Sequence, residues 1–202
     1  MEVLRRYGKS PFGVVVVHGG PGAGGEMEPV ARELSLNYGV LEPLQTAGTV
    51  EGQVGELRRI IEEDAATPVT LVGWSWGAWL CYLTTARYPS RVKKLILVSS
   101  GPFEEGYAKE IMEVRLRRLP TGDRRRVETI MHKLQGKEKD EGSFKEFGAL
   151  MEKADSYNLL PKTDEGKIEF SLKIYESVWR EASDLRSSGE LLERGRNITC
   201  PV

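Results

Sequence analysis

The chain has 202 residues, of which 40% are hydrophobic and 29% are charged, and its 29 basic and 30 acidic side chains leave a net charge near −1. This composition is typical of one good-sized globular domain, or of a domain with a large insertion, and the balanced charge gives no general attraction to nucleic acid or to an anionic membrane. We therefore expect neither a nucleic-acid partner nor a membrane partner, and the sequence does not indicate an oligomeric state.

The N-terminal segment and the cysteines favour a cytoplasmic setting. Basic residues precede the apolar run Phe12–Val17, but the run is too short for a signal peptide and no small-residue cleavage site follows it. No stretch approaches the roughly 18 apolar residues of a membrane helix. The two cysteines, Cys81 and Cys200, each lie in an apolar segment, which favours reduced thiols over a disulfide framework.

The first hundred residues alternate between apolar runs and helical stretches. The runs are β-branched and continuous, as in parallel strands that are covered on both faces. We expect strands at Gly13–Val17, Tyr38–Leu41, Val69–Val72 and Leu95–Val98, and helices at Met27–Leu36, Val50–Asp64 and Trp76–Tyr88. This order predicts an α/β fold with a right-handed, mostly parallel sheet.

The charge content and the apolar pattern of the sequence change after Ser100. Residues 1–100 hold 20 of the charged side chains and residues 101–197 hold 39, and the later segments place apolar residues at helical spacing. We therefore expect a core domain at residues 1–100, a helical insertion with solvated outer faces at 101–196, and the start of a returning sheet strand at 197–202.

A glycine-rich stretch, "VHGGPGAGG", follows the first strong strand. It contains the pattern G-x-G-x-x-G, at Gly20, Gly22 and Gly25. With Glu42 near the end of the next strand as a ribose-binding acid, this pattern allows a nucleotide- or dinucleotide-binding module. Against that alternative, Pro21 removes an amide donor from the turn and the motif has no use for His18. The other interpretation is an oxyanion hole, in which glycine permits a tight turn and close substrate approach.

A second motif, "GWSWG", joins the strand at Val69–Val72 to the helix that begins at Trp76. It matches the G-x-S-x-G nucleophile turn in its required context of strand, turn and helix. Ser75 is then the nucleophile and the N–H of Trp76 an oxyanion donor at a helix N-terminus. Trp74, beside the serine, is a candidate wall for a substrate pocket.

Together, "HGGPG" at 18–22 and "GWSWG" at 73–77 resemble the α/β-hydrolase superfamily, and within it the proline iminopeptidase-like branch. The resemblance implies an α/β-hydrolase sheet with helices on both faces and a helical cap, acting as a serine hydrolase on carboxylic esters or small peptide and amide substrates. It implies Ser75 as nucleophile, Gly20 and Trp76 as oxyanion donors, and loop support from a further set of residues. That set comprises His18, Gly19, Pro21 and Gly22.

Two departures qualify the resemblance. The branch carries a D-x-R-G-x-G-x-S segment where this chain reads "LEPLQTAGTVEGQ", which weakens the peptidase assignment but not the hydrolase one. The superfamily's triad runs Ser, then Asp or Glu, then His, and the only histidine after Ser75 is His132, in a charged amphipathic stretch.

We expect the triad acid and histidine to fall after Val202, on a longer polypeptide that is truncated here before its last strands. The alternative is that His132 serves Ser75, oriented by Glu128 or Asp123. Without the partners, the 202 residues are expected to be weakly active or inactive. No metal or cofactor is expected. Besides the serine hydrolase, a nucleotide-binding module and a non-catalytic hydrolase-like binding protein stay open.

Overall fold

A computed structural model describes residues 2–136, 140–158 and 168–202. The chain forms two compact units. The first comprises Met1–Glu105 together with Thr163–Val202, and the second comprises Gly106–Lys162.

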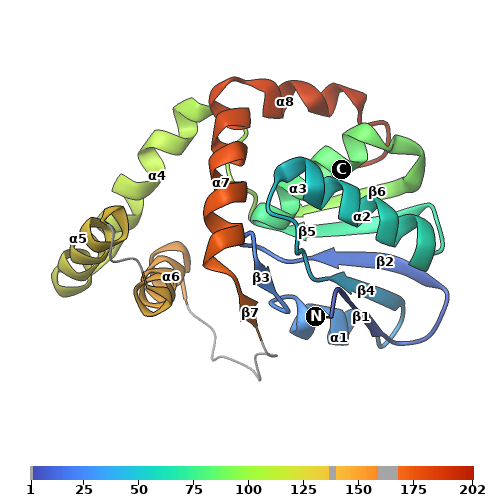
Figure 1. Cartoon of the computed structure of the whole chain (residues 1–202), viewed down its shortest axis with the longest axis horizontal. Coiled ribbons are helices and arrows are strands. Elements are labelled where there is room, and N and C mark those ends of the chain that lie inside the picture. The colour runs from blue at the N-terminus through green and yellow to red at the C-terminus, as the bar shows by residue number, and fades with distance from the viewer. Residues whose placement is uncertain (1, 137–139, 159–167) are drawn as a thin grey trace. The chain divides into compact units, whose positions relative to one another are not determined.

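The first unit is built on a five-stranded sheet in the order β1-β4-β2-β5-β6 (Figure 1). Its strands are β1 Leu4–Tyr7, β2 Phe12–Val17, β4 Gly39–Pro43, β5 Val69–Trp74 and β6 Val92–Val98. All neighbouring pairs are parallel except β1 with β4. The four predicted strands and the mostly parallel α/β sheet are confirmed. Strand β1 was not expected, because a four-residue edge strand containing two arginines has no apolar run to announce it.

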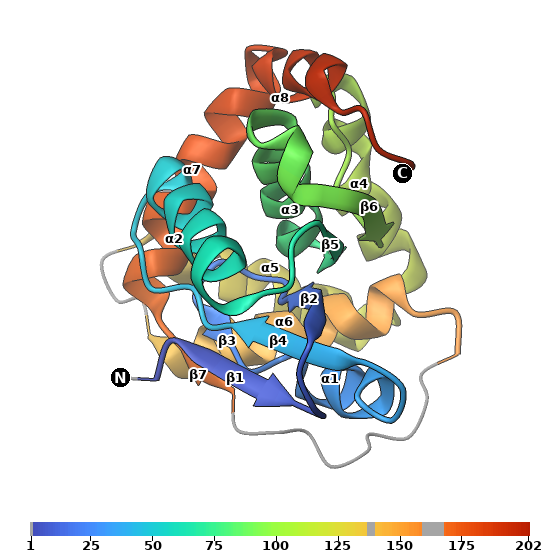
Figure 2. The same cartoon turned by 90° about the vertical axis from the view of Figure 1, so that its right-hand side faces the viewer.

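Helices cover both faces of this sheet (Figure 2). Helix α2, Val50–Asp64, and helix α3, Trp76–Arg87, pack with Val15, Leu71 and Leu95 in the main apolar cluster. Helix α1, Glu28–Leu34, covers the opposite face, where Ala31 packs with Val16, Val40 and Val72. Because successive strand residues point to opposite faces, the neighbours Val15 and Val16 enter different clusters.

Helix α7, Leu172–Ser187, belongs to the first unit, although it falls inside the predicted insertion at 101–196. Its buried residues Val178 and Ala182 lie in the same apolar cluster as the sheet. Charge and helical periodicity identified the helix, but they carry no information about which body it packs against. The short helix α8, Glu190–Arg194, follows it.

In its described residues, the second unit contains three helices with an apolar cluster of their own. They are α4 Glu105–Arg118, α5 Thr121–Gln135 and α6 Glu141–Asp155. The cluster includes Val127, Ile130 and Leu150. Helix α6 starts at an Asp140 cap whose carboxylate accepts a hydrogen bond from Ser143 N at 2.8 Å. Within the described ranges, no helix combines the length and apolar character needed to cross a bilayer.

Residues 195–202 lie beside the edge of the sheet. Gly195–Asn197 form a 3-10 turn, and Leu95 N of β6 donates a hydrogen bond to Pro201 O at 3.0 Å. In the described structure, residues 198–202 are not assigned as a strand. The segment expected to start a returning strand therefore touches β6 through its backbone without forming a ladder.

Candidate active site

Ser75 occupies a sharp turn between β5 and α3. Its backbone has φ 52° and ψ −113°, a positive φ that side chains rarely adopt. The turn is tethered because Ser75 N donates a hydrogen bond to Val98 O, the last residue of β6, at 3.0 Å. The serine side chain is half-buried at the C-terminal end of the parallel strands, the end at which open α/β sheets bind ligands.

The two glycines that flank the serine turn have no room for a side chain. A Cβ on Gly73 would lie 2.2 Å from Gly77 O, and a Cβ on Gly77 would lie 2.2 Å from Val17 O at the end of β2. The glycines therefore let α3 start close against β2 and β5. This close approach holds Ser75 in its unusual conformation, and backbone strain of this kind gathers at functional sites.

Trp76, the first residue of α3, is fixed by two buried amides. Its indole Nε1 donates to Gln53 Oε1 at 2.9 Å and to Gln45 Oε1 at 3.2 Å, and its side chain is 1% exposed. The N–H groups of the first helical turn have no acceptor within the helix, so the main-chain N–H of Trp76 makes no hydrogen bond within α3. Nothing in the sequence predicts that Gln45 and Gln53 lie beside a tryptophan that follows them by 31 and 23 residues.

The glycine-rich loop that follows β2 is held at several points. Gly20 and Gly22 have φ of 43° and 79°, and Ala23 N donates to Gly20 O at 2.9 Å to close a tight turn. Gly22 O accepts a hydrogen bond from Ser171 N, at the start of α7, at 2.9 Å. The loop continues into the short strand β3, Ala23–Gly24, which pairs with β7, Glu169–Phe170. Gly22 also approaches α7 so closely that a Cβ would lie 2.8 Å from Ser171 O.

Trp74 lies against this loop. A Cβ on Gly19 would come within 2.7 Å of Trp74 Cε3, so the indole packs directly on the glycine backbone. The other contacts of Trp74 are with the apolar cluster beneath α1. The structure thus places the predicted pocket residue between the glycine loop and the sheet, with part of its surface exposed.

His18 is buried within the loop as a neutral ring. Its Nδ1 donates to Gly19 O at 2.7 Å, and its Nε2 accepts from Gln45 N at 3.4 Å. Complete burial lowers the pKa of His18 from 6.5 to about 4, because the charged form would be desolvated. Both ring nitrogens are engaged in holding the loop, so His18 is not placed to take a proton from Ser75.

The other histidine, His132, lies exposed on α5 of the second unit. Asp123, one of its two suggested orienting acids, forms an ion pair with Lys153 at 2.6 Å. Among the described residues of the first unit, no histidine remains that could serve Ser75. The described residues also contain no group of three metal-ligating side chains.

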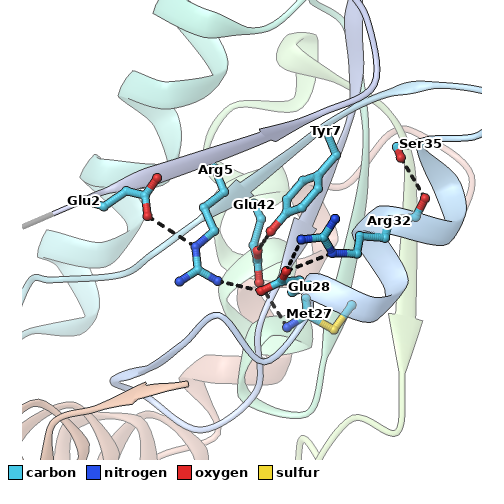
Figure 3. A network of polar contacts seen from close by, with 8 residues as sticks. All are labelled: Glu2, Arg5, Tyr7, Met27, Glu28, Arg32, Ser35 and Glu42. Atoms are coloured by element: carbon cyan, nitrogen blue, oxygen red, sulfur yellow. Dashed lines mark hydrogen bonds and ion pairs between the residues drawn. The ribbon is translucent and has the colours of Figure 1, made fainter. Parts of the chain in front are cut away.

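Glu42 is committed to a structural network (Figure 3). The carboxylate is fully buried and accepts hydrogen bonds from Tyr7 Oη at 2.7 Å and Met27 N at 3.1 Å. Burial raises the pKa of Glu42, with the Tyr7 hydrogen bond opposing that shift. Beside it, Arg5 forms an ion pair with Glu28 at 3.1 Å. A carboxylate with these partners is not available to bind a ribose. The dinucleotide-binding alternative therefore lacks the acidic residue that it requires beside the glycine pattern.

A depression on the described surface lies elsewhere. It measures about 740 Å³ and is lined by residues that include Lys9, Tyr38, Thr70 and Lys93. These residues lie near the beginnings of the parallel strands, at the opposite end of the sheet from Ser75. This depression is therefore separate from the serine turn.

Comparisons with known proteins agree with this architecture. A family model described as alpha/beta hydrolase fold matches residues 46–139. The biotin biosynthesis bifunctional protein BioHC of Teredinibacter turnerae (strain ATCC 39867 / T7901) is 26% identical over 155 residues, which are 76% of this chain and 26% of that protein. The chain thus spans about a quarter of the length of this curated relative.

Three solved structures, each 20% identical to this chain, share its fold. E-2-(acetamidomethylene)succinate hydrolase matches with a TM-score of 0.58 over 98% of this chain and 74% of that one. The thioesterase domain from the curacin biosynthetic pathway has a TM-score of 0.55, with 98% and 75% covered. An esterase from a marine microorganism has a TM-score of 0.52, with 91% and 72% covered. With its sheet order and serine turn, this chain has the α/β-hydrolase fold.

Proposed function

We propose that the chain belongs to a serine hydrolase that cleaves carboxylic esters or small amides through Ser75. The observation that carries the proposal is the Ser75 turn, with φ 52° between two glycines that have no space for a Cβ. A serine on such a turn presents its hydroxyl to a carbonyl carbon at the mouth of the sheet. The structural neighbours include an esterase and a thioesterase domain, which supports the same reaction class.

The oxyanion donors in this proposal are the N–H groups of Gly20 and Trp76. Attack on a carbonyl places negative charge on oxygen, and fixed backbone donors stabilise that charge without reorganisation. The loop around Gly20 is fixed by His18, Trp74 and Ser171, and Trp76 is fixed by its two buried glutamine partners. Removing one such donor from a serine hydrolase costs about 10²–10³ in rate.

The proposed substrates are esters, amides or short peptides, and we propose no nucleic-acid or membrane partner. We also propose that the chain resembles the proline iminopeptidase-like branch, on the basis of the "HGGPG" and "GWSWG" motifs alone. A cytoplasmic setting also stays a proposal, and it is supported by two unpaired cysteines, Cys81 and Cys200. Hydrolysis of p-nitrophenyl acetate against prolyl-p-nitroanilide separates esterase from aminopeptidase activity.

Labelling by a fluorophosphonate tests the nucleophile, because this probe bonds covalently to an activated serine. We expect labelling of a chain extended past Val202, where the proposed acid and histidine would lie, no labelling of its Ser75→Ala variant, and weak or no labelling of the 202 residues alone. Ser99→Ala is the matched control, since Ser99 is an exposed serine that also has a positive φ, 46°, in the turn after β6. Labelling that survives in Ser75→Ala, or that is absent from the extended chain, overturns the proposal.

The same assay tests the base. His132→Ala abolishes labelling if His132 serves Ser75, and leaves the labelling rate unchanged if it is an exposed helix residue without a part in the chemistry. We expect the second result, because His132 lies on the charged outer surface of α5.

A further inference from the structure

The segment that follows β4 hydrogen-bonds to both elements of the proposed oxyanion hole. Gln45 N donates to His18 Nε2 at 3.4 Å, and Gln45 Oε1 accepts from Trp76 Nε1 at 3.2 Å. His18 lies in the glycine loop that carries Gly20, and Trp76 carries the other proposed donor. We call residues 45–47 the bridging segment, because its first residue connects the glycine loop to the first turn of α3.

Helix α2 fixes the backbone of the bridging segment. The carboxylate of Glu56 accepts hydrogen bonds from Thr46 N and Ala47 N, both at 3.1 Å, and from the Thr46 hydroxyl. Gln53 Nε2 donates to Ala47 O at 3.0 Å. Charge-assisted hydrogen bonds are roughly twice as strong as neutral ones, so Glu56 is the main anchor of the segment. In the described part of the chain, the hydrogen bonds of Glu56 all go to this segment.

Gln45 is buried with one polar group unpaired. The residue is 6% exposed, and its Nε2 has no protein acceptor among the described residues. Burying an amide donor without an acceptor costs free energy, and an apolar side chain of similar size would fill the space without that cost. Core packing alone therefore does not account for a glutamine here, whereas the acceptor that its Oε1 provides to Trp76 does.

We propose that the bridging segment sets the relative position of the two oxyanion donors, the N–H groups of Gly20 and Trp76. Gln45 and Glu56 are then positioning residues, which act through the glycine loop and α3 and touch no reacting atom. This inference rests on the proposed function of Ser75. The two donors must meet one oxygen atom, so a shift of either one weakens the stabilisation. A misplacement of about 1 Å can cost about 10²-fold in rate, even when the residue that causes it lies far from the chemistry.

NMR of the 202-residue chain tests these connections without any need for turnover. Glu56→Ala should shift two signals, the Nε2 nitrogen of the His18 ring and the indole N–H of Trp76, because the released segment contacts both. Gln45→Leu should shift the indole signal alone, since the anchored backbone keeps its main-chain N–H at His18. Glu56→Gln keeps an acceptor oxygen and should stay closest to the wild type. Glu63→Ala, on the exposed surface of the same helix, is the matched control and should shift neither signal.

Fluorophosphonate labelling of the chain extended past Val202 tests the effect on the oxyanion hole. Glu56→Ala and Gln45→Leu should each lower the maximal labelling rate roughly tenfold, because the donors act on the oxygen that gains charge during attack. The probe concentration that gives half the maximal rate should stay unchanged. A residue that only stabilises the fold would lower the urea midpoint and leave the maximal rate of the folded chain unchanged. Glu56→Gln should recover most of the rate.

The inference is overturned if Glu56→Ala does not move both NMR signals, or if either Glu56→Ala or Gln45→Leu labels at the wild-type maximal rate. If Glu56→Ala does not fold, the labelling rate of Gln45→Leu decides the question. An extended wild-type chain that is not labelled at all overturns the proposed reaction and this inference with it. Labelling of the extended wild type with unchanged rates in the variants overturns the inference alone.

Discussion

Replacing Gly77 by alanine should both destabilise the first unit and impair Ser75. The new Cβ would lie 2.2 Å from Val17 O and 2.6 Å from His18 O, whereas real Cβ atoms do not approach other atoms within 3.0 Å. Both obstructing atoms are backbone oxygens at the end of β2, so no side-chain rotation can relieve the overlap. Overpacking of this kind typically costs 1–3 kcal/mol, and a rigid obstacle places Gly77→Ala at about 3 kcal/mol.

That cost is a large part of the 5–15 kcal/mol by which domains are ordinarily stable. Urea unfolding measures it, and Gly55→Ala provides the control, because Gly55 lies within α2 with nothing near its added Cβ. Alanine there should stabilise the chain by about 0.5–1 kcal/mol through helix propensity. In the chain extended past Val202, Gly77→Ala should also label slowly with fluorophosphonate, since relief of the overlap shifts α3 and the Trp76 N–H. Wild-type stability and wild-type labelling of Gly77→Ala would refute the packing argument.

Three further perturbations test the surroundings of the serine turn. Gln53→Leu should cost about 1–2 kcal/mol in urea unfolding, because the buried Trp76 indole loses its shorter hydrogen bond, 2.9 Å, and keeps the one of 3.2 Å. His18, with its pKa lowered to about 4, should stay neutral by NMR titration down to that pH. In the unfolded chain this ring has a pKa near 6.5. The neutral buried His18 therefore contributes about 3 kcal/mol to the free energy of unfolding above pH 6.5, and this contribution is lost as the pH falls toward 4. A His18 ring that titrates near pH 6.5 in the folded chain would contradict this prediction. Glu42→Ala should lower the free energy of unfolding by roughly 2–3 kcal/mol, because Tyr7 Oη and Met27 N lose their acceptor. NADH should bind neither the wild type nor this variant. Saturable NADH binding by the wild type would restore the dinucleotide alternative.

The sequence predicted the parts of the fold that are written in local patterns. Continuous β-branched runs indicated the four parallel strands, and the bounds of α2, Val50–Asp64, agree with the structure. The serine turn could also be predicted from its two glycines. In the structure, a side chain at either glycine would overlap backbone atoms. Local patterns fail where partners are distant in the chain. The Trp76–Gln53 hydrogen bond and the β3–β7 pair join segments whose separate sequences show no sign of each other.

Helix α7 illustrates the same limit. Its amphipathic sequence looked like part of the inserted helices, yet its contacts belong to the sheet unit and to the loops around Ser75. Ser171 holds the glycine loop at Gly22, and Glu181 reaches the loop before α2, where its carboxylate accepts a hydrogen bond from Val50 N at 2.8 Å. One helix therefore supports both the glycine loop after β2 and the loop after β4.

The bond between Glu181 and Val50 gives a direct test of that role. Val50 N is the first amide of α2, and a carboxylate at a helix N-terminus stabilises it by cap bonding and by the helix dipole, together about 0.5–2 kcal/mol. Glu181→Gln keeps the size and an acceptor oxygen but removes the charge, so it should lose the smaller part of that energy, and Glu181→Ala should lose most of it. Hydrogen exchange at the first turn of α2 reads the effect locally, with Glu33→Ala on the exposed side of α1 as the control. Glu181 belongs to α7, so faster exchange in Glu181→Ala shows that α7 packs on the sheet unit in solution. Exchange equal to that of the wild type would contradict this packing and favour α7 as part of the helical insertion that the sequence predicted.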